Sequence, residues 1–124
     1  MTRDTQAGSR KGTPQDLNLA VVVGTVTKDA VVTEATGGRT YTSFDVVCRT
    51  GGDRTVVPVT VAREINIRAD TRVAVLGRVE KRFFPAGSGF TARTDVRAES
   101  VTVLRRPSQL SRVLEEAAGH LAGV

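Results

Sequence analysis

Short runs of β-branched residues, each ended by a turn, dominate the middle of this 124-residue chain. Valine and threonine are frequent in four of them: LAVVVGTVT, TYTSFDVVCR, TVVPVTV and TRVAVLGRVEKR. Such residues favour extended strands, and the clusters TGGR, RTGGDR and PAGSG between the runs favour turns. Gly24 and Gly77 interrupt the first and fourth runs, which indicates a sharp bend or a close backbone approach in each strand. The pattern predicts an all-β domain of short, bent strands.

The order of the predicted elements favours a closed barrel over an open sheet. Three strands are predicted within residues 19–61, a helix of about two turns at AREINIRAD (residues 62–70), and two more strands up to Leu104. Five strands with one short helix between strands 3 and 4 are typical of the five-stranded OB-fold barrel. The alternative is a plain five-stranded antiparallel sheet, but the glycine bends favour closure.

The two ends of the chain differ from its middle. Residues 1–17 are polar and predict a disordered N-terminal arm, residues 18–104 form the predicted OB-fold domain, and residues 105–124 predict a C-terminal amphipathic helix. An apolar stripe recurs along that helix at Leu110, Val113, Leu114, Ala117 and Leu121. The stripe predicts packing against a subunit or another protein partner.

Charge and composition narrow the function classes. A net charge of +5 and a pI of about 10.3 favour a polyanionic partner, nucleic acid above all. No apolar run approaches the roughly 20 residues that span a bilayer, and the N-terminus lacks the apolar segment of a signal peptide. A single cysteine fits a reducing compartment. We therefore expect a cytoplasmic protein with no membrane partner.

Catalytic motifs are missing from the sequence. It contains no P-loop, no G-x-S-x-G and no Cys-x-x-Cys motif, and its only cysteine and only histidine, Cys48 and His120, lie far apart. A lone histidine on a terminal helix does not make a metal site. The sequence predicts a protein that is not an enzyme and needs no metal or cofactor.

Four segments, taken in order, resemble bacterial single-stranded DNA-binding proteins: NLAVVVGTVTKDA (18–30), GRTYTSFDVV (38–47), RVAVLGRVEKR (72–82) and TDVRAESVTVL (94–104). The resemblance implies an OB-fold that binds single-stranded DNA and assembles as a dimer or tetramer, with roles in DNA replication and repair. It also implies stacking aromatics near Asp53 and at Val59, which are absent here, and a third at Phe84. The loop RTGGDR is short for the family, and an amphipathic helix replaces its acidic C-terminal tip.

The stretch EKRFFPAGSGFTAR (residues 80–93) is the main candidate site, because it holds three of the five aromatic residues between cations. Single strands are bound by cations that follow phosphates and by flat rings that stack on bases. Alternation along the fourth strand predicts Val75, Val79 and Phe83 on the core side, with Arg78, Arg82 and Phe84 outside. Val57 and Val59 are expected to point outward from the third strand. The predicted nucleic-acid-binding residues are Arg49, Arg54, Arg78, Arg82, Phe84, Phe90, Arg93 and Tyr41.

Two functions stay open at this point. One is sequence-nonspecific binding of single-stranded nucleic acid, DNA in particular, through a basic face with few aromatics. The other is a protein-interaction or scaffold module, with weak or no DNA binding, that docks a partner through the C-terminal helix. Phe84 and Phe90 could equally stack on bases or pin the hairpin against itself or a second subunit, and Tyr41 could stack or pack against a subunit.

Overall fold

The computed structural model describes residues 15–123, except for the side chain of Phe84. It contains six strands and one helix: β1 (Ala20–Val26), β2 (Val31–Glu34), β3 (Thr40–Thr50), β4 (Asp53–Val61), β5 (Thr71–Ala86), β6 (Gly89–Val103) and α1 (Pro107–Ala122). Most of the predicted N-terminal arm, residues 1–14, lies outside the described residues. The C-terminal helix is confirmed.

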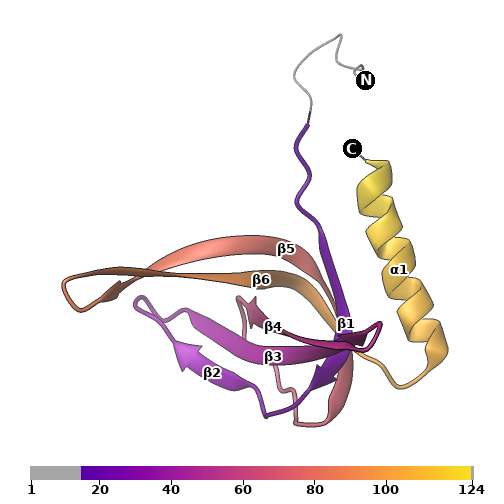
Figure 1. Ribbon diagram of the computed structural model, residues 1–124, viewed down its shortest axis with the longest axis horizontal. Coiled ribbons are helices and arrows are strands. Elements are labelled where there is room, and N and C mark those ends of the chain that lie inside the picture. The colour runs from indigo at the N-terminus through magenta and orange to yellow at the C-terminus, as the bar shows by residue number, and fades with distance from the viewer. Residues whose placement is uncertain (1–14, 124) are drawn as a thin grey trace.

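The strands close into the predicted OB-fold barrel (Figure 1). They are ordered β1-β5-β6-β4-β3-β2, and a further pairing of β1 with β3 closes the ring at Thr25 and Val26. β4 and β6 run parallel, whereas the other pairs are antiparallel. β2 follows β1 in the chain and pairs with the edge of β3. The other five strands form the barrel itself.

Valines from every barrel strand fill the interior. The core consists of Val26, Phe44, Val46, Val59, Val61, Ile67, Val73, Val75, Val96 and Ala98. The prediction that Val57 and Val59 point outward is wrong, because Val59 is buried in this core and Val57 packs against it. Pro58 between them faces the other way, opposite the exposed Asp45.

No helix forms between β4 and β5, so the predicted helix at residues 62–70 is wrong. The segment bonds to other parts of the chain instead. Thr42 Oγ1 donates to the carbonyl of Arg63 and accepts from the amide of Ile65, while Asp29 Oδ1 accepts from the amide of Ala69. Ile67 is buried and Ile65 is partly buried, a period of two that belongs to extended chain. These long-range bonds replace those of a helix turn.

A bulge in β6 changes which residues of the strand point into the core. Leu76 lies opposite Ser100 but Gly77 lies opposite Ala98, which leaves Glu99 as the extra residue. The extra residue inverts the alternation of β6. Val96 and Ala98 therefore point into the core before the bulge, and Val101 packs against the core after it.

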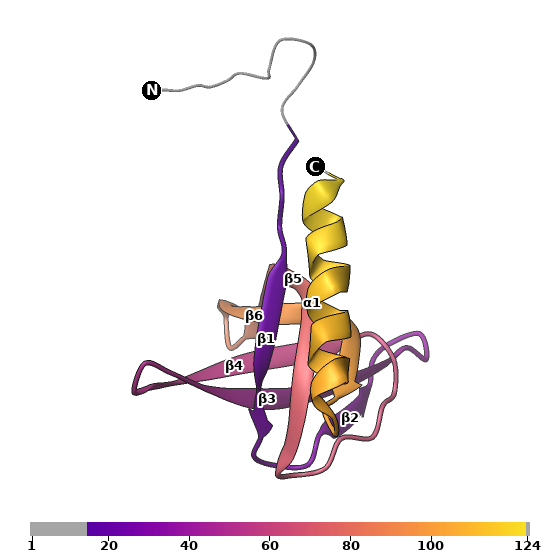
Figure 2. The same cartoon turned by 90° about the vertical axis from the view of Figure 1, so that its right-hand side faces the viewer.

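The helix α1 lies across β5 and beside β1 (Figure 2). Val113 and Ala117, one turn apart, are buried, and on β5 Ala74 and Leu76 are buried on the side away from Val73 and Val75. Leu114 and Leu121 on the neighbouring stripe remain about half exposed. The helix thus covers one outer part of the barrel but leaves apolar surface uncovered.

Gly77 is needed for the contact between β5 and β6. A Cβ at this position would lie 2.9 Å from the Cα of Ala98 and closer still to the carbonyl oxygen of Arg97. We predict that Gly77→Ala lowers the free energy of unfolding by roughly 1–3 kcal/mol. For a domain of this size each kcal/mol lowers the melting temperature by roughly 4–8 °C. Gly89→Ala is the matched control, because a Cβ there meets nothing within 4 Å. Equal melting temperatures for the two variants would contradict the role of Gly77.

Candidate nucleic-acid interface

The hairpin of β5 and β6 projects beyond the barrel, at the left of Figure 1. β1 pairs with β5 only up to Gly77, and β4 pairs with β6 only from Val96 onward. The side chain of Asn18 ends the β1 edge by bonding to both the amide and the carbonyl of Val79, at 2.9 and 2.8 Å. Beyond this point the two strands pair with each other as far as the turn, through Ala86 and Gly89.

Phe83 is exposed, contrary to prediction. The residue is 66% exposed and Val79 is 49% exposed, although both lie on the side of β5 that carries Val75. Alternation gave the correct side of the strand, but the barrel ends before these residues, so no core lies beneath them. The inward packing predicted for Phe83 and the core position predicted for Val79 are therefore wrong.

One side of the projecting hairpin carries exposed rings. Phe83 pairs with Ala92 and Pro85 pairs with Phe90, so these four residues share a side that we call the aromatic face. Phe90 is 76% exposed. The ammonium group of Lys81 lies 5.6 Å from the centre of the Phe83 ring, within the range of a cation–π contact. The side chain of Phe84 lies outside the described part of the structure, and its role stays a prediction.

The opposite side of the hairpin carries a hydrogen-bonded ion pair. Arg82 Nη2 lies 2.7 Å from Asp95 Oδ2 and 3.1 Å from the hydroxyl of Thr60 on β4. Thr60 in turn donates to Asp95 Oδ2 at 2.6 Å. The carboxylate of Asp95 is 1% exposed. Arg82, predicted as a phosphate contact, is thus held by a buried acid.

Further ion pairs extend this side toward the barrel. Glu80 bonds to Arg78 at 3.4 Å and to Arg97 at 3.3 Å, and Arg78 lies 3.9 Å from Glu99. We call the set Arg78, Glu80, Arg82, Asp95, Arg97 and Glu99 the ion-pair face. Three arginines meet three acids in this set, so the set itself has no net charge, and Arg93, opposite Arg82, adds a positive charge on the same side. Asp95, Glu80 and Arg97 were not among the predicted site residues. The available signal was the alternation of acids and arginines along two paired strands.

Of the remaining predicted cations, Arg93 lies opposite Arg82 on the same side of the β5–β6 hairpin, whereas Arg49 and Arg54 lie elsewhere. Within residues 15–123 the side chains of Arg49, Arg54 and Arg93 form no ion pair. Arg49 and Arg54 face each other across the β3–β4 hairpin, whose tip lies at the opposite end of the molecule from the β5–β6 tip (Figure 1). The structure therefore does not gather all predicted cations into one row.

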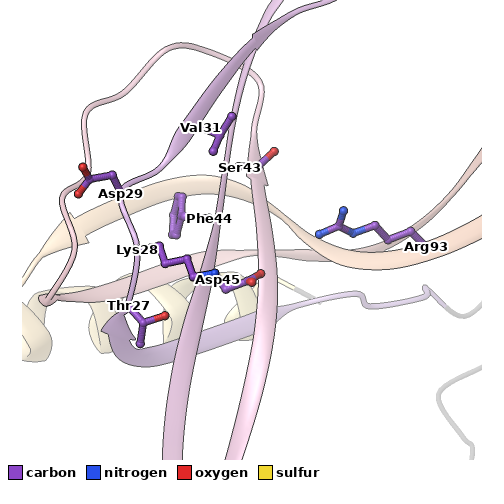
Figure 3. A pocket seen from close by; sticks show the side chains of 8 residues that line it. All are labelled: Thr27, Lys28, Asp29, Val31, Ser43, Phe44, Asp45 and Arg93. Atoms are coloured by element: carbon purple, nitrogen blue, oxygen red, sulfur yellow. The ribbon is translucent and has the colours of Figure 1, made fainter.

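Arg93 lies at a shallow groove of about 230 Å³. Figure 3 shows its side chain reaching from β6 toward β3 and the connection between β1 and β2. The other lining residues are Thr27, Lys28, Asp29, Val31, Ser43, Phe44 and Asp45. Lys28 adds a second cation to this groove, while Asp29 and Asp45 add two acids.

Tyr41 borders a second groove. The guanidinium carbon of Arg97 lies 5.6 Å from the centre of the Tyr41 ring and so holds the ring by a cation–π contact. The groove has a volume of about 340 Å³ and is lined by Thr33, Ala35, Tyr41, Ser43, Thr60 and Arg82. Two predicted site residues, Tyr41 and Arg82, therefore meet at one place.

Among residues 15–123, no three His, Cys, Asp or Glu side chains lie together in a way that could hold a metal ion. The same part of the chain has no helix that is both long enough and apolar enough to cross a membrane.

The comparisons with known proteins rest on structure. No protein-family model and no curated protein matches the chain. The structure is similar to the SSB of Plasmodium falciparum in its complex with ssDNA, with a TM-score of 0.61 and 16% sequence identity. The alignment covers 75% of this chain and 99% of the other. The fold is therefore an OB-fold barrel similar to that of this SSB, in keeping with the fold that the resemblance in sequence implied.

The Arg82–Asp95 pair should matter for stability. We predict that Arg82→Ala lowers the free energy of unfolding by roughly 1–3 kcal/mol, because it leaves a buried carboxylate without its cation. Arg78→Ala is the control, since its pairs are exposed and worth about 0–1 kcal/mol. Thermal melts of both variants test this. A smaller effect for Arg82→Ala than for Arg78→Ala would contradict it.

Proposed function

We propose that this chain is a non-catalytic protein that binds single-stranded DNA with little sequence preference. The observation that carries the proposal is the aromatic face, where Phe83 and Phe90 present most of their rings to solvent on a projecting hairpin. Exposed rings of this kind stack on bases of any sequence. The similarity in fold to an SSB that was solved with ssDNA supports the same function.

The distribution of charge sets the expected strength of binding. Arg78, Arg82 and Arg97 are neutralised within the ion-pair face, so they add little net attraction for phosphate. Lys81 and Arg93 have no acid partner among the described residues. Lys81 lies on the aromatic face beside Phe83, and Arg93 lines the groove on the other side of the hairpin. Stacking therefore supplies a larger share of the affinity than the pI suggests, and we expect modest affinity.

Self-association and cellular role form part of the proposal. Leu114 and Leu121 on α1, together with Val21 on β1, leave apolar side chains exposed on one part of the barrel. A homodimer or homotetramer would cover them. We propose a cytoplasmic protein that takes part in DNA replication or repair, in keeping with the resemblance in sequence.

The alternative is a protein-interaction or scaffold module. The same exposed leucines of α1 favour it, because they could dock another protein instead of a second copy. In this alternative the chain binds DNA weakly or not at all. DNA binding itself separates the two functions.

The aromatic face gives the first test. We predict that Phe83→Ala and Phe90→Ala each weaken binding of a labelled single-stranded oligonucleotide by roughly 1–3 kcal/mol, because each removes one stacking ring. Both should leave the melting temperature nearly unchanged, since the rings are exposed. Fluorescence anisotropy at low salt measures the affinity, and Val56→Ala, an exposed apolar residue on β4, is the control. If the wild-type chain binds no oligonucleotide at low salt, the scaffold function is favoured.

The dependence on salt gives the second test. Affinity for a single strand falls with salt, by about 0.7 in log–log slope for each phosphate contact. We predict that Arg93→Ala flattens the slope by about one contact. Arg78→Ala should change it less, because Glu80 and Glu99 already neutralise Arg78. Anisotropy titrations at several salt concentrations measure both slopes, and a larger change for Arg78→Ala would contradict the assignment of Arg93.

A further inference from the structure

A basic hollow lies where β6 leads into α1, at the opposite end of the molecule from the tip of the β5–β6 hairpin (Figure 1). Its volume is about 250 Å³, just below the roughly 300–1,000 Å³ of small-molecule pockets, and it has room for one side chain of a partner. The lining residues are Arg72 on β5, Leu104, Arg105 and Arg106 in the connection, and Pro107 and Leu110 on α1. We call it the arginine hollow.

Hydrogen bonds hold the backbone around the arginine hollow. The amide of Leu104 donates to the carbonyl of Arg72 at 2.8 Å, which joins the end of β6 to the start of β5. The side-chain oxygen Oε1 of Gln109 accepts from the amides of Arg105 and Arg106, at 2.6 and 2.8 Å. The backbone that carries the three arginines is therefore ordered before a ligand arrives, which lowers the entropy cost of binding.

The hollow combines cations that have no acid partner with an aliphatic floor. Arg72, Arg105 and Arg106 are exposed, and within residues 15–123 none of them forms an ion pair. The described part of the chain contributes no acid to the lining. Leu104 and Leu110 are partly buried beside the arginines. The hollow therefore differs from the ion-pair face, where acids already neutralise the arginines.

This chemistry suits carboxylates that lie next to an apolar side chain. A guanidinium binds a carboxylate through two parallel hydrogen bonds, and aliphatic residues gain from covering an apolar side chain. Nucleic acid fits less well, because no aromatic ring lines the hollow and a base would find nothing to stack on. A second copy of the chain carries the same net charge of +5, and residues 1–14 contain more cations than acids, so neither complements the arginines.

We propose that the arginine hollow binds an acidic peptide segment of another protein, with one apolar side chain seated on Leu104 and Leu110 and its carboxylates on the arginines. The site is separate from the aromatic face, because Arg72 lies eleven residues before Phe83 on β5, roughly 35 Å along the strand. A protein partner and a single strand of DNA can therefore be bound at the same time. The inference does not depend on DNA binding.

The test measures fluorescence anisotropy of short labelled peptides with the full chain. One peptide has a leucine between two pairs of glutamates, and the other has serine in place of the leucine at the same charge. The variant Arg105→Glu reverses one charge of the hollow. Arg112→Glu is the matched control, because it makes the same change at an exposed residue of α1 that does not line the hollow. Melting temperatures of both variants check that the fold is kept.

We expect the leucine peptide to bind about tenfold more tightly than the serine peptide, because only leucine buries apolar surface on the floor of the hollow. Arg105→Glu should weaken binding of the leucine peptide about tenfold, and Arg112→Glu by less than about twofold, because only the first meets the bound carboxylates directly. Phe83→Ala should leave peptide binding unchanged, and Arg105→Glu should leave binding of a single-stranded oligonucleotide unchanged.

Several outcomes would overturn the proposal. If the wild-type chain binds neither peptide, or both equally, the hollow does not recognise an acidic segment with an apolar side chain. If the two glutamate variants weaken binding equally, net charge attracts the peptide and the hollow does not.

Two other occupants would also show themselves. If the oligonucleotide displaces the peptide and Arg105→Glu weakens oligonucleotide binding, the hollow holds nucleic acid. If Arg105→Glu but not Arg112→Glu changes the mass measured by light scattering, the hollow holds a second copy. Either result overturns the proposal. If the chain binds the leucine peptide as expected but no oligonucleotide, the proposed function fails and the peptide site stands.

Discussion

Closure of the barrel depends on one strand that two neighbours share. β1 pairs with β5 along its whole length and with β3 at Thr25 and Val26. Where these pairings meet, a Cβ on Gly24 would run into the carbonyl oxygen of Val47 and would lie 2.9 Å from a methyl group of Val46. Only a residue without a side chain permits that approach. Closure uses the first half of β5, so its second half leaves the barrel together with the part of β6 that precedes Val96. The site exists because β5 and β6 are longer than the barrel they close.

The ion-pair face changes what the high pI means for binding. Net charge describes attraction at long range, whereas binding of phosphate depends on cations without acid partners. Asp95 is nearly inaccessible, and it joins Arg82 of β5 to Thr60 of β4 across β6. The same contacts that bind the projecting hairpin to the barrel therefore reduce its positive charge. The ion pairs therefore order the hairpin but weaken its electrostatic attraction for phosphate. Stacking of bases on exposed rings would compensate for the weaker attraction.

Much of the fold could be predicted from the sequence, because strand order and glycine bends are local signals. The C-terminal helix and the closed barrel both followed from pattern. Residues 62–70 were wrongly predicted as a helix. Their extended conformation depends on hydrogen bonds to Thr42 and Asp29, which are distant in sequence. Alternation likewise gave the correct side for Phe83 but not its exposure, because burial depends on where β1 and β4 stop pairing. The partner of Arg82 was hidden for a related reason. Asp95 meets it only after the turn between Ala86 and Gly89 has set the register of the hairpin.

A hairpin that projects from a barrel has two solvent-facing sides, and strict alternation assigns each residue to one of them. In the barrel one side must be apolar because it faces the core. Beyond the barrel that requirement ends, yet Phe83 and Phe90 keep an apolar character on that side without any core to cover them. Exposing two rings costs solvation and solubility. A chain with four phenylalanines and one tyrosine has few to expose, and among the aromatic side chains that the structure describes only Phe44 lies in the barrel core. Placing the rings where they bury so little surface is understandable if their partner is a ligand, and the bases of a flexible single strand can reach both rings without a fixed sequence.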